Sequence, residues 1–539
     1  MKNHSFIVLT VFALATTVPS DAFSDEALSG KSFAKCGTPF IVKQMAEHGS
    51  LEKTAYQGYD RQEMDAFADS REGHFRVHYN TSGNDAPSLV DMDLNGIPDY
   101  IDSTLVFLEI AWQTIVVDLG YGTPRSDGTR GGGQDITDCY IMELSRNSLY
   151  GLTTPDIGIG TMSSSYLSID NNFTDHIYPT KGYSALKITT AHEFFHVIHF
   201  SYYGAEEALW WMEHSAVWME NRIWGDVDDY FNYLGYYFEN MDLPLDTING
   251  SFEYGAALFA MYLAERHGDS IIRTVWTRFR DSRDGTIETL NAVVPGGVGT
   301  ALSEMASWLY FTGVRANPDK YFMDSAKIAN MIVPEHVLSE PAAFDSLSMR
   351  HYTFSYIDIA AANGFSPGDS LTFQFKDYDN GLWINSILFY TSPTNAETVI
   401  IPSGTGVINV TRPFDHAIVI VTNATQGINR KYRYTLNLDF ADSQGVEDNP
   451  APEQTVLLQN TPNPFNNTTM IPFILSGNSH VSLEIFDIRG VRVSRLIDGV
   501  LDAGRHQALF DARDLSSGSY FAVLTAGNTR TTSKLLFLK

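Results

Sequence analysis

The sequence predicts an α+β domain followed by two all-β domains, and three changes of pattern along the chain lead to this prediction. From residue 74 to 170, short alternating runs typical of strands flank one apolar run with helical spacing. From about residue 185 to 315 the pattern is mostly helical and rich in Trp, Tyr and Phe. After about Ser339, short alternating runs separated by turn residues indicate β-sandwiches. A chain of 539 residues with 44% hydrophobic residues is long enough for several cores.

The N-terminus has the features of a secretory signal peptide. A basic start at Lys2 precedes an apolar run from Phe6 to Val18, and small residues around Ser20 predict cleavage after Ala22. The run is too short for a permanent membrane span, and no later segment approaches 18 apolar residues. We therefore expect a signal peptide at 1–22 and no transmembrane segment in the mature chain.

The charge balance limits the partners. The chain carries 36 Lys and Arg against 64 Asp and Glu, a net charge of −28. This charge repels nucleic acid and anionic membrane surfaces, and it suits solubility outside the cell and cation binding. We expect no nucleic-acid partner.

The predicted helices, strands and linker, together with the signal peptide, divide the chain into six segments. Residues 23–70 have no strong period and form an N-terminal arm or pro-segment. In the domain at 71–338, strands are expected at 74–79, 138–144 and 164–170, a helix at 103–119 and further helices from 185 to 315. Residues 339–443 form a β-sandwich, 444–454 a Pro-containing linker and 455–539 a second all-β domain.

The sequence His192-Glu193-Phe194-Phe195-His196 predicts a zinc site. Two histidines four apart share one face of a helix and can bind one metal, and Glu193 beside them can act on a water molecule. A catalytic zinc also needs a third protein ligand and an open position. The alternative interpretation is a helix with two ordinary histidines.

Glu213 is the third ligand that we favour. The metzincin arrangement fails, because it needs Gly where this chain has His199 and His where it has Tyr202. Glu213 lies on the next predicted helix, as in the gluzincin pattern, and Glu220 is the fallback ligand or a residue that orients a histidine. His199 and His214 are interpreted as packing residues or residues behind the ligands.

The predicted site supports zinc-dependent hydrolysis. Zinc lowers the pKa of bound water, Glu193 acts as general base, and a Tyr or His steadies the oxyanion. The segment from Phe252 to Leu258 resembles the Tyr-Glu-x-Gly segment of gluzincin aminopeptidases, but Phe252 stands at the family's Tyr position. Tyr254 is the substitute candidate, and a core aromatic is the alternative.

A second candidate metal site lies before the predicted helix at 103–119. Residues 91–102 match a 12-residue calcium loop, although the last position holds Asp instead of Glu. The candidate calcium ligands are Asp91, Asp93, Asn95, Ile97, Asp99 and Asp102. The alternative is an Asp-rich solvated turn.

The state of the two cysteines has three interpretations. In an exported chain a Cys36–Cys139 disulfide is the default. However, Cys36-Gly37-Thr38-Pro39 resembles the Cys-Gly-x-Pro core of the matrix-metalloprotease cysteine switch, in which a thiolate fills the open position of zinc. Free thiols are the third reading.

Two longer resemblances extend these motifs. Residues 36 to about 315 resemble a family of bacterial HExxH metallopeptidases, which share Cys-Gly-Thr-Pro, Gly-x-Pro-Asp-Tyr and Ala-His-Glu-Phe-Phe-His. This implies a gluzincin-like enzyme of peptidase clan MA with a zincin-like fold. The last 80 or so residues, including Asn463-Pro464-Phe465-Asn466 and Leu515-Ser516-Ser517-Gly518, resemble a type IX secretion (type A) sorting domain with a FlgD-type Ig-like fold. A plain adhesion sandwich is the alternative.

The sequence therefore predicts a secreted or surface-attached zinc endopeptidase with a protein or peptide substrate and the type IX secretion machinery as partner. One alternative is a non-catalytic surface or adhesion protein with a structural metal site, which a site crowded by Cys36 or His199 would favour. Another is a metal-dependent hydrolase of a non-peptide substrate.

Overall fold

The computed structural model describes most of the chain. The described stretches are 35–48, 61–132, 135–329, 331–332, 334–360, 369–392, 394–401, 405–410, 414, 416–427, 430–441, 455–458, 460, 463, 465, 468–501, 504–513, 515–527 and 529–538. The predicted signal peptide, much of the predicted arm and the predicted linker lie outside them.

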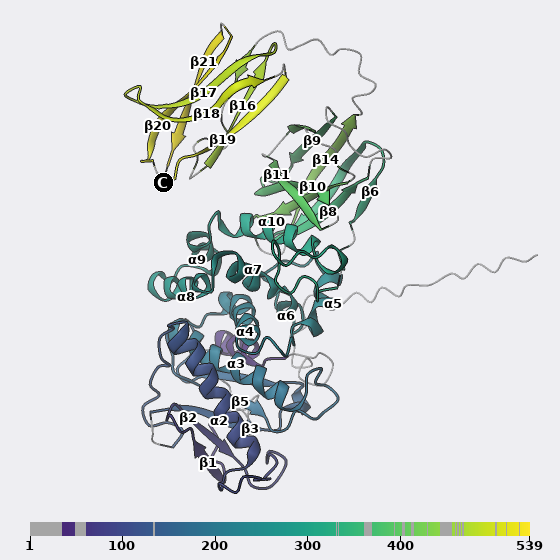
Figure 1. The fold of residues 1–539 in the computed structure, drawn as a ribbon. Coiled ribbons are helices and arrows are strands. Elements are labelled where there is room, and N and C mark those ends of the chain that lie inside the picture. Colours follow the sequence, from purple (N-terminus) through teal and green to yellow (C-terminus); the bar gives the residue numbers. More distant parts are fainter. Residues whose placement is uncertain are drawn as a thin grey trace, which may run out of the picture. The chain divides into compact units, whose positions relative to one another are not determined.

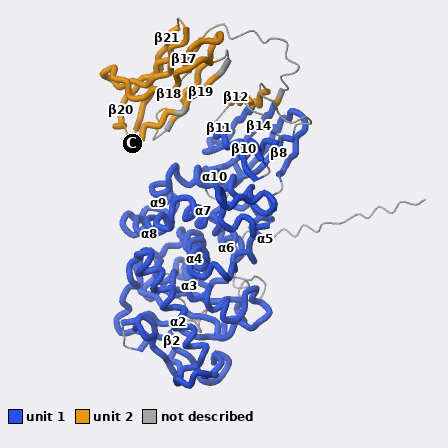
Figure 2. The backbone as a smooth tube through the Cα atoms, viewed as in Figure 1, with its two compact units in different colours: residues 1–364, 373–405, 414–439 blue, residues 365–372, 406–413, 440–539 orange. Residues whose placement is uncertain are grey.

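The chain divides into two compact units, which are coloured separately in Figure 2. The first comprises residues 1–364, 373–405 and 414–439, and the second comprises 365–372, 406–413 and 440–539. Most of the segment predicted as a separate sandwich at 339–443 therefore belongs to the same unit as the helices before it.

A five-stranded sheet begins the first unit. Its order is β1-β2-β3-β5-β4, with parallel pairing of β3 to β2 and β5 and antiparallel pairing at both ends of the sheet. The strands are β1 Ala66–Asp69, β2 Phe75–Tyr79, β3 Thr137–Met142, β4 Gly151–Pro155 and β5 Ser165–Asp170. The three predicted strands are thus present as β2, β3 and β5, and β4 forms one edge.

The predicted helix at 103–119 is present as α2 (Asp99–Trp112), which continues into η1 (Gln113–Asp118). Within the described residues, the stretch Asp99–Asp118 has the length and apolar composition to cross a membrane, with a mean hydropathy of 1.3. This departs from the expectation that no later segment approaches a span. Its buried face, with Ile101, Leu105 and Leu108, packs against α3 and β2 as a core helix does (Figure 1).

Eight helices follow within the described part of the first unit, in agreement with the predicted helical region. They are α3 Gly182–Tyr202, α4 Leu209–Ile223, α5 Phe231–Glu239, α6 Phe252–Ala256, α7 Leu258–His267, α8 Ser270–Ser282, α9 Thr286–Val293 and α10 Gly297–Tyr310. α3 packs against β4, β5 and α4, and it is buried on nearly all sides from Ala185 onwards. Polar groups on such a helix need partners inside the protein, because water does not reach them.

Two sheets follow the helices, as the alternating pattern predicts. Their orders are β11-β10-β13-β8-β6 and β12-β9-β14-β7. The strands are β6 His336–Leu338, β7 Ala342–Arg350, β8 Thr353–Ile359, β9 Ser370–Asp377, β10 Trp383–Ser392, β11 Asn395–Ile401, β12 Thr405–Asn409, β13 Ala417–Asn423 and β14 Lys431–Ala441. The first of these sheets packs on α10, and the hydroxyl of Tyr356 donates to the carbonyl oxygen of Ala306 at 2.7 Å. Helices and sheet therefore share one hydrophobic core.

The C-terminal region is mostly β, as predicted. It contains a sheet of order β15-β16-β19 and a sheet of order β18-β17-β20-β21. The strands are β15 Val456–Leu457, β16 Thr468–Leu475, β17 Ser479–Asp487, β18 Arg492–Leu501, β19 Gly504–Asp511, β20 Gly518–Ala526 and β21 Thr529–Phe537. It has a core of its own, built around Ile471, Leu483 and Phe537.

Candidate metal centre

Helices α3 and α4 bring the predicted zinc ligands together. His192 and His196 lie one turn apart on α3, and Glu213 faces them from α4. The Nε2 atoms of the two histidines are 3.0 Å apart. The carboxylate oxygens of Glu213 lie 3.3 Å from Nε2 of His192 and 3.1 Å from Nε2 of His196. All three side chains are fully buried.

These distances fit a tetrahedral zinc ion. Ligand atoms at the usual zinc–nitrogen and zinc–oxygen distances are about 3.3 Å from one another. Neither carboxylate oxygen of Glu213 accepts a well-oriented hydrogen bond from the residues that the structure describes, although the carboxylate is buried. Two facing imidazole nitrogens and an unsatisfied carboxylate suit a cation placed between them.

The electrostatics of this pocket also favour positive charge. Burial lowers the pKa of His192, but contacts with Glu213 and Glu220 outweigh burial and raise that pKa to about 10. Burial acts to raise the pKa of Glu213, but the neighbouring His196 and His192 lower it to about 2. The buried carboxylates of Glu213 and Glu220 therefore favour positive charge in this pocket.

Glu193 lies beside this cluster and has polar partners. Its carboxylate accepts a hydrogen bond from Oγ1 of Thr153 at 2.7 Å and a longer one of 3.4 Å from Oγ1 of Thr38. Burial raises the pKa of Glu193, and the two histidines act against this. The absence of a side chain at Gly151 on β4 provides the space for the Glu193 side chain, because a Cβ at this position would lie 2.8 Å from Cγ of Glu193.

Two further residues hold the histidines in place from behind. An oxygen of Glu220 lies 2.6 Å from Nδ1 of His192, and Nδ1 of His199 lies 3.1 Å from Nδ1 of His196. Nε2 of His199 lies 3.2 Å from the hydroxyl of Ser215. Such contacts fix the ring orientation and leave Nε2 of each ligand directed at the metal position. Glu220 therefore contacts His192 on its Nδ1 side, whereas Glu213 faces Nε2 of both histidines.

Cys36 joins the cluster, which corrects the disulfide expectation. Both cysteines are free and buried. One ligand atom from each of Cys36, His192, His196 and Glu213 lies within 4.8 Å of the others. Because both thiols are free, the default Cys36–Cys139 pairing is wrong in this structure. Burial, together with Glu193 and Glu213, raises the pKa of the Cys36 thiol.

Tyr254 contacts Cys36. Its hydroxyl oxygen accepts a hydrogen bond of 3.0 Å from the backbone N–H of Cys36, and its ring is fully buried against Tyr233. The hydroxyl is therefore directed at the site, whereas the neighbouring Phe252 has no polar group to offer. Tyr254 is both a core aromatic and a candidate for the oxyanion.

The predicted calcium loop brings three carboxylates together in an exposed segment. Ligand atoms of Asp91, Asp93 and Asp99 lie within 4.8 Å of one another, and Asp91 and Asp93 accept hydrogen bonds from the backbone of Asn95. Asp102 instead lies 2.5 Å from the side-chain nitrogen of Asn95 and is not part of the three-carboxylate group. Ile97, whose carbonyl was the expected ligand, donates its N–H to Asn95. The loop is largely exposed.

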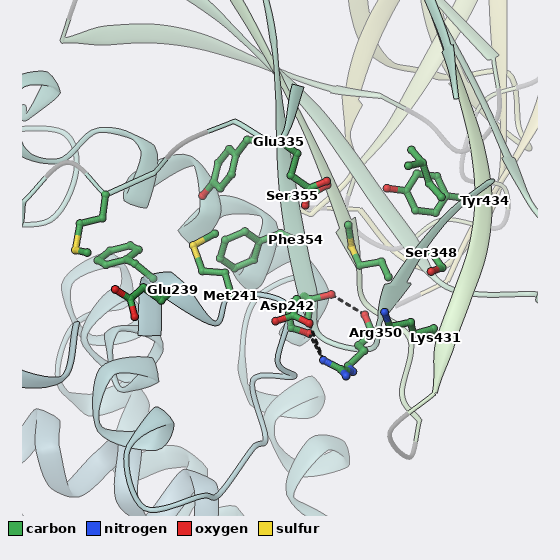
Figure 3. A pocket seen from close by; sticks show the side chains of 16 residues that line it. Glu239, Met241, Asp242, Glu335, Ser348, Arg350, Phe354, Ser355, Lys431 and Tyr434 are labelled. Carbon is green, nitrogen blue, oxygen red and sulfur yellow. Dashed lines mark hydrogen bonds and ion pairs between the residues drawn. The ribbon is translucent and has the colours of Figure 1, made fainter. Parts of the chain in front are cut away.

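A cavity of about 400 Å³ lies elsewhere in the first unit, between the end of α5 and strands β7, β8 and β14 (Figure 3). Met241, Phe354 and Tyr434 give it apolar walls, and Arg350 forms an ion pair of 2.8 Å with Asp242 at its border. Its lining residues include none from α3 or α4, so this cavity is separate from the metal cluster.

Comparison with known proteins identifies the C-terminal region. Residues 461–538 match the family model described as "Secretion system C-terminal sorting domain". The chain therefore ends in a type IX secretion sorting domain and is a secreted protein exported through that machinery. The match covers 78 residues of the C-terminal region and says nothing about the function of the first unit.

Solved structures add no functional argument, because the similarity is weak. PliG of Aeromonas hydrophila, a periplasmic inhibitor of g-type lysozyme, is 12% identical with a TM-score of 0.17 over 20% of this chain and 97% of that chain. β-Glucuronidase 3 of Bacteroides uniformis is 14% identical with a TM-score of 0.13, over 35% of this chain and 28% of that chain. Tripeptidyl peptidase 2 is 12% identical with a TM-score of 0.16, over 37% and 24% of the two chains. No curated protein matches this sequence significantly.

Several residues around the site carry no local sequence signal. Thr153, which binds Glu193, and Gly151, which makes room for it, lie on an edge strand that the alternation of residues does not predict. Thr38 begins α1 (Thr38–His48), in a segment where the sequence predicts no period. Thr38 contacts residues more than 100 positions away, and Thr153 contacts Glu193 across 40 positions, so only the fold brings these residues together.

Proposed function

We propose that this protein is an exported zinc endopeptidase of the zincin-like, gluzincin type, whose site is closed by its own Cys36. One observation carries the proposal: the ligand atoms of His192, His196 and Glu213 meet at tetrahedral distances, with the Glu193 carboxylate beside them. Zinc, when bound there, supplies a Lewis acid and lowers the pKa of bound water.

The side chains of the chain then have defined tasks. Glu193 accepts a proton from the attacking water and passes it to the leaving amine, and Thr153 holds its carboxylate in place. Glu220 and His199 keep the two histidines oriented. Tyr254 turns its hydroxyl towards the developing oxyanion once the N–H of Cys36 has left it.

Cys36 makes the closed form latent. Its sulfur would occupy the fourth position of a bound zinc, which a catalytic zinc needs to keep open for water. The buried state of Cys36, His192 and Glu193 also keeps substrate away from the metal. Displacement of the segment that carries Cys36 opens the site.

A structural zinc is the second candidate function, because four protein ligands also close a structural site. A structural site does not require Glu193. Burial of this carboxylate next to the ligands costs desolvation energy, which a purely structural role does not explain. A structural site also has no use for the hydroxyl of Thr153 directed at that carboxylate. We therefore favour the peptidase.

The test compares casein cleavage by full-length Cys36→Ala and Cys36→Ala/Glu193→Gln. Loss of the general base should lower the rate about 10²- to 10⁴-fold. Chelator should abolish the activity, and a Cys36→Ala/Glu207→Gln control, which changes an exposed carboxylate, should keep it. Equal rates with and without Glu193 would exclude the peptidase mechanism.

Latency has its own measurement. Full-length Cys36→Ala should cleave casein faster than wild type, whereas Cys139→Ala should not. With Co²⁺ in place of zinc, a thiolate ligand adds near-ultraviolet charge-transfer absorption, which Cys36→Ala should lose and Cys139→Ala should keep. Identical spectra for wild type and Cys36→Ala would contradict the role of Cys36.

A calcium ion at Asp91, Asp93 and Asp99 is part of the proposal with a structural role. The three carboxylates and the turn at Gly96 suit a hard cation ahead of α2. Calcium titration followed by isothermal calorimetry tests it, with loss of the heat signal expected for Asp93→Asn.

A further inference from the structure

The segment Lys35–Thr38 lies along the edge strand β4 as an added strand would. The N–H of Tyr150 donates to the carbonyl oxygen of Lys35 at 2.9 Å, and the N–H of Gly37 donates to that of Gly151 at 2.9 Å. The N–H of Thr153 continues the row by donating to Oγ1 of Thr38 at 2.8 Å. An edge strand next to a hydrolytic site is a place where an extended polypeptide binds through its backbone.

The side chain of Lys35 enters a closed acidic pocket one residue before Cys36. Its Nζ lies 2.6 Å from an oxygen of Glu220 on α4 and 2.5 Å from an oxygen of Asp229. The rings of Tyr150 and Tyr233 lie 6.0 and 5.5 Å from the ammonium group. Lys35 is only 2% exposed, so the pocket encloses its ammonium group.

The pocket is organised around the cation. The other oxygen of Asp229 accepts hydrogen bonds from Thr180 and, at 3.1 Å, from the side chain of Asn232. The other oxygen of Glu220 contacts His192. Removal of Lys35 would leave two buried carboxylates without the ammonium charge that they share, which is strongly unfavourable in a medium of low polarity. A segment that leaves this pocket therefore leaves a site that attracts another cation.

Resting on the proposed peptidase function, we infer that the pocket of Glu220 and Asp229 is a subsite for a Lys or Arg side chain of the substrate, and that Lys35 fills it in the latent form. The same edge strand that pairs with Lys35–Thr38 pairs with the substrate backbone. A basic side chain near the scissile bond then meets the two carboxylates and the two tyrosine rings. The substrate class is polypeptide with a basic residue at one fixed position.

The test is the cleavage profile of full-length Lys35→Ala/Cys36→Ala on a peptide library, read by mass spectrometry. Cleaved peptides should carry Lys or Arg at one fixed position within two residues of the cut, enriched about tenfold over neutral residues. Adding Asp229→Asn should remove most of that enrichment. Adding Asp226→Asn, which neutralises an exposed carboxylate nearby in the sequence, should leave it.

The outcomes separate the two proposals. Cleavage without a basic preference, or with a preference that Asp229→Asn does not change, would overturn the subsite and leave the peptidase intact. Cleavage that is the same with Glu193→Gln would overturn the peptidase itself. If the double variant fails to fold, the full chain with a specific protease site placed between residues 48 and 61 is nicked and profiled instead.

A measurement without catalysis tests the pocket directly. Full-length Lys35→Ala should melt at a lower temperature than wild type, because Glu220 and Asp229 lose their cation. Millimolar n-butylammonium should restore part of the loss, whereas uncharged n-butanol should not. Equal effects of the two compounds would show that the pocket has no preference for a basic side chain, and the inference would fail.

Discussion

The buried cluster on α3 and α4 and the exposed loop at 91–102 are both groups of metal-binding residues, but they differ in solvent access. His192, His196 and Glu213 are shielded from water, and the oxygens of Glu213 accept no well-oriented hydrogen bond from described residues. Asp91 and Asp93 accept hydrogen bonds from the backbone of their own loop and stay in contact with solvent.

The difference teaches what burial adds to a spacing pattern. Exposed carboxylates are stable with or without a cation, because water and nearby N–H groups satisfy them. Buried carboxylates are costly unless a cation or a proton compensates them. The first site should therefore depend on its metal for stability, and the second should respond only weakly.

Removal of zinc should have the largest effect. Treatment with a zinc-selective chelator should lower the melting temperature of the first unit by roughly 10 °C or more, because the metal binds the folded state alone. Differential scanning calorimetry of wild type measures this shift. A Glu213→Gln variant should melt low with or without chelator, and a chelator-insensitive wild type would contradict the comparison.

A buried carboxylate away from the ligands should give the next largest effect. Burial raises the pKa of Glu253 to about 7, although the N–H groups of Asn249 and Gly250 act against this. Since the folded state holds this proton more tightly, the free energy of unfolding should fall as the pH rises from 4.5 to about 7. The loss is at most about 3 kcal/mol.

Urea unfolding at pH 5 and pH 8 measures this loss. Glu253→Gln should flatten the pH dependence, whereas an exposed carboxylate variant such as Asp93→Asn should not. The same slope in wild type and Glu253→Gln would show that another group is responsible.

Filling the space beside Gly151 with a methyl group should cause a smaller loss of stability. A Cβ at this position would lie 2.8 Å from side-chain carbons of both Glu193 and Thr189, so Gly151→Ala should destabilise the protein by about 1–3 kcal/mol. Gly235→Ala on α5 has open space around its Cβ and should be neutral or stabilising, by up to about 1 kcal/mol. Urea unfolding of both variants provides the check, and equal destabilisation would contradict the packing argument.

Calcium should have the smallest effect. Because the carboxylates of the loop are already solvated, millimolar Ca²⁺ should raise the melting temperature by no more than a few degrees. Asp93→Asn should abolish that rise and leave the zinc-dependent shift unchanged. A calcium shift as large as the zinc shift would break the proposed contrast.

The sequence was most informative where the chemistry is local. A four-residue spacing on one helix predicts that His192 and His196 share a face, and the structure brings Glu213 to both. The three predicted strands of the first sheet are present as β2, β3 and β5. The family match at 461–538 confirms the sorting domain.

The parts that could not be predicted depend on contacts between distant segments. Lys35 meets Glu220 and Asp229 across more than 180 residues, and Cys36 meets a cluster that starts at His192. No local period marks the segment at 35–48, and a Gly-Leu-Thr-Thr-Pro strand such as β4 has little alternation of apolar residues. The exported context also suggested a disulfide for two cysteines that are free in the structure.

The shared core of α10 and the sheet of β8, β10 and β13 has a practical consequence for protein engineering. Gly299 approaches Ala424 so closely that a Cβ on the glycine would lie 2.4 Å from that of the alanine, and Tyr356 binds the backbone of α10. A truncation at residue 339 would strip this helix of its cover and give an insoluble fragment. Expression of the first unit without its export signal should therefore end beyond Ala441, where β14 is complete.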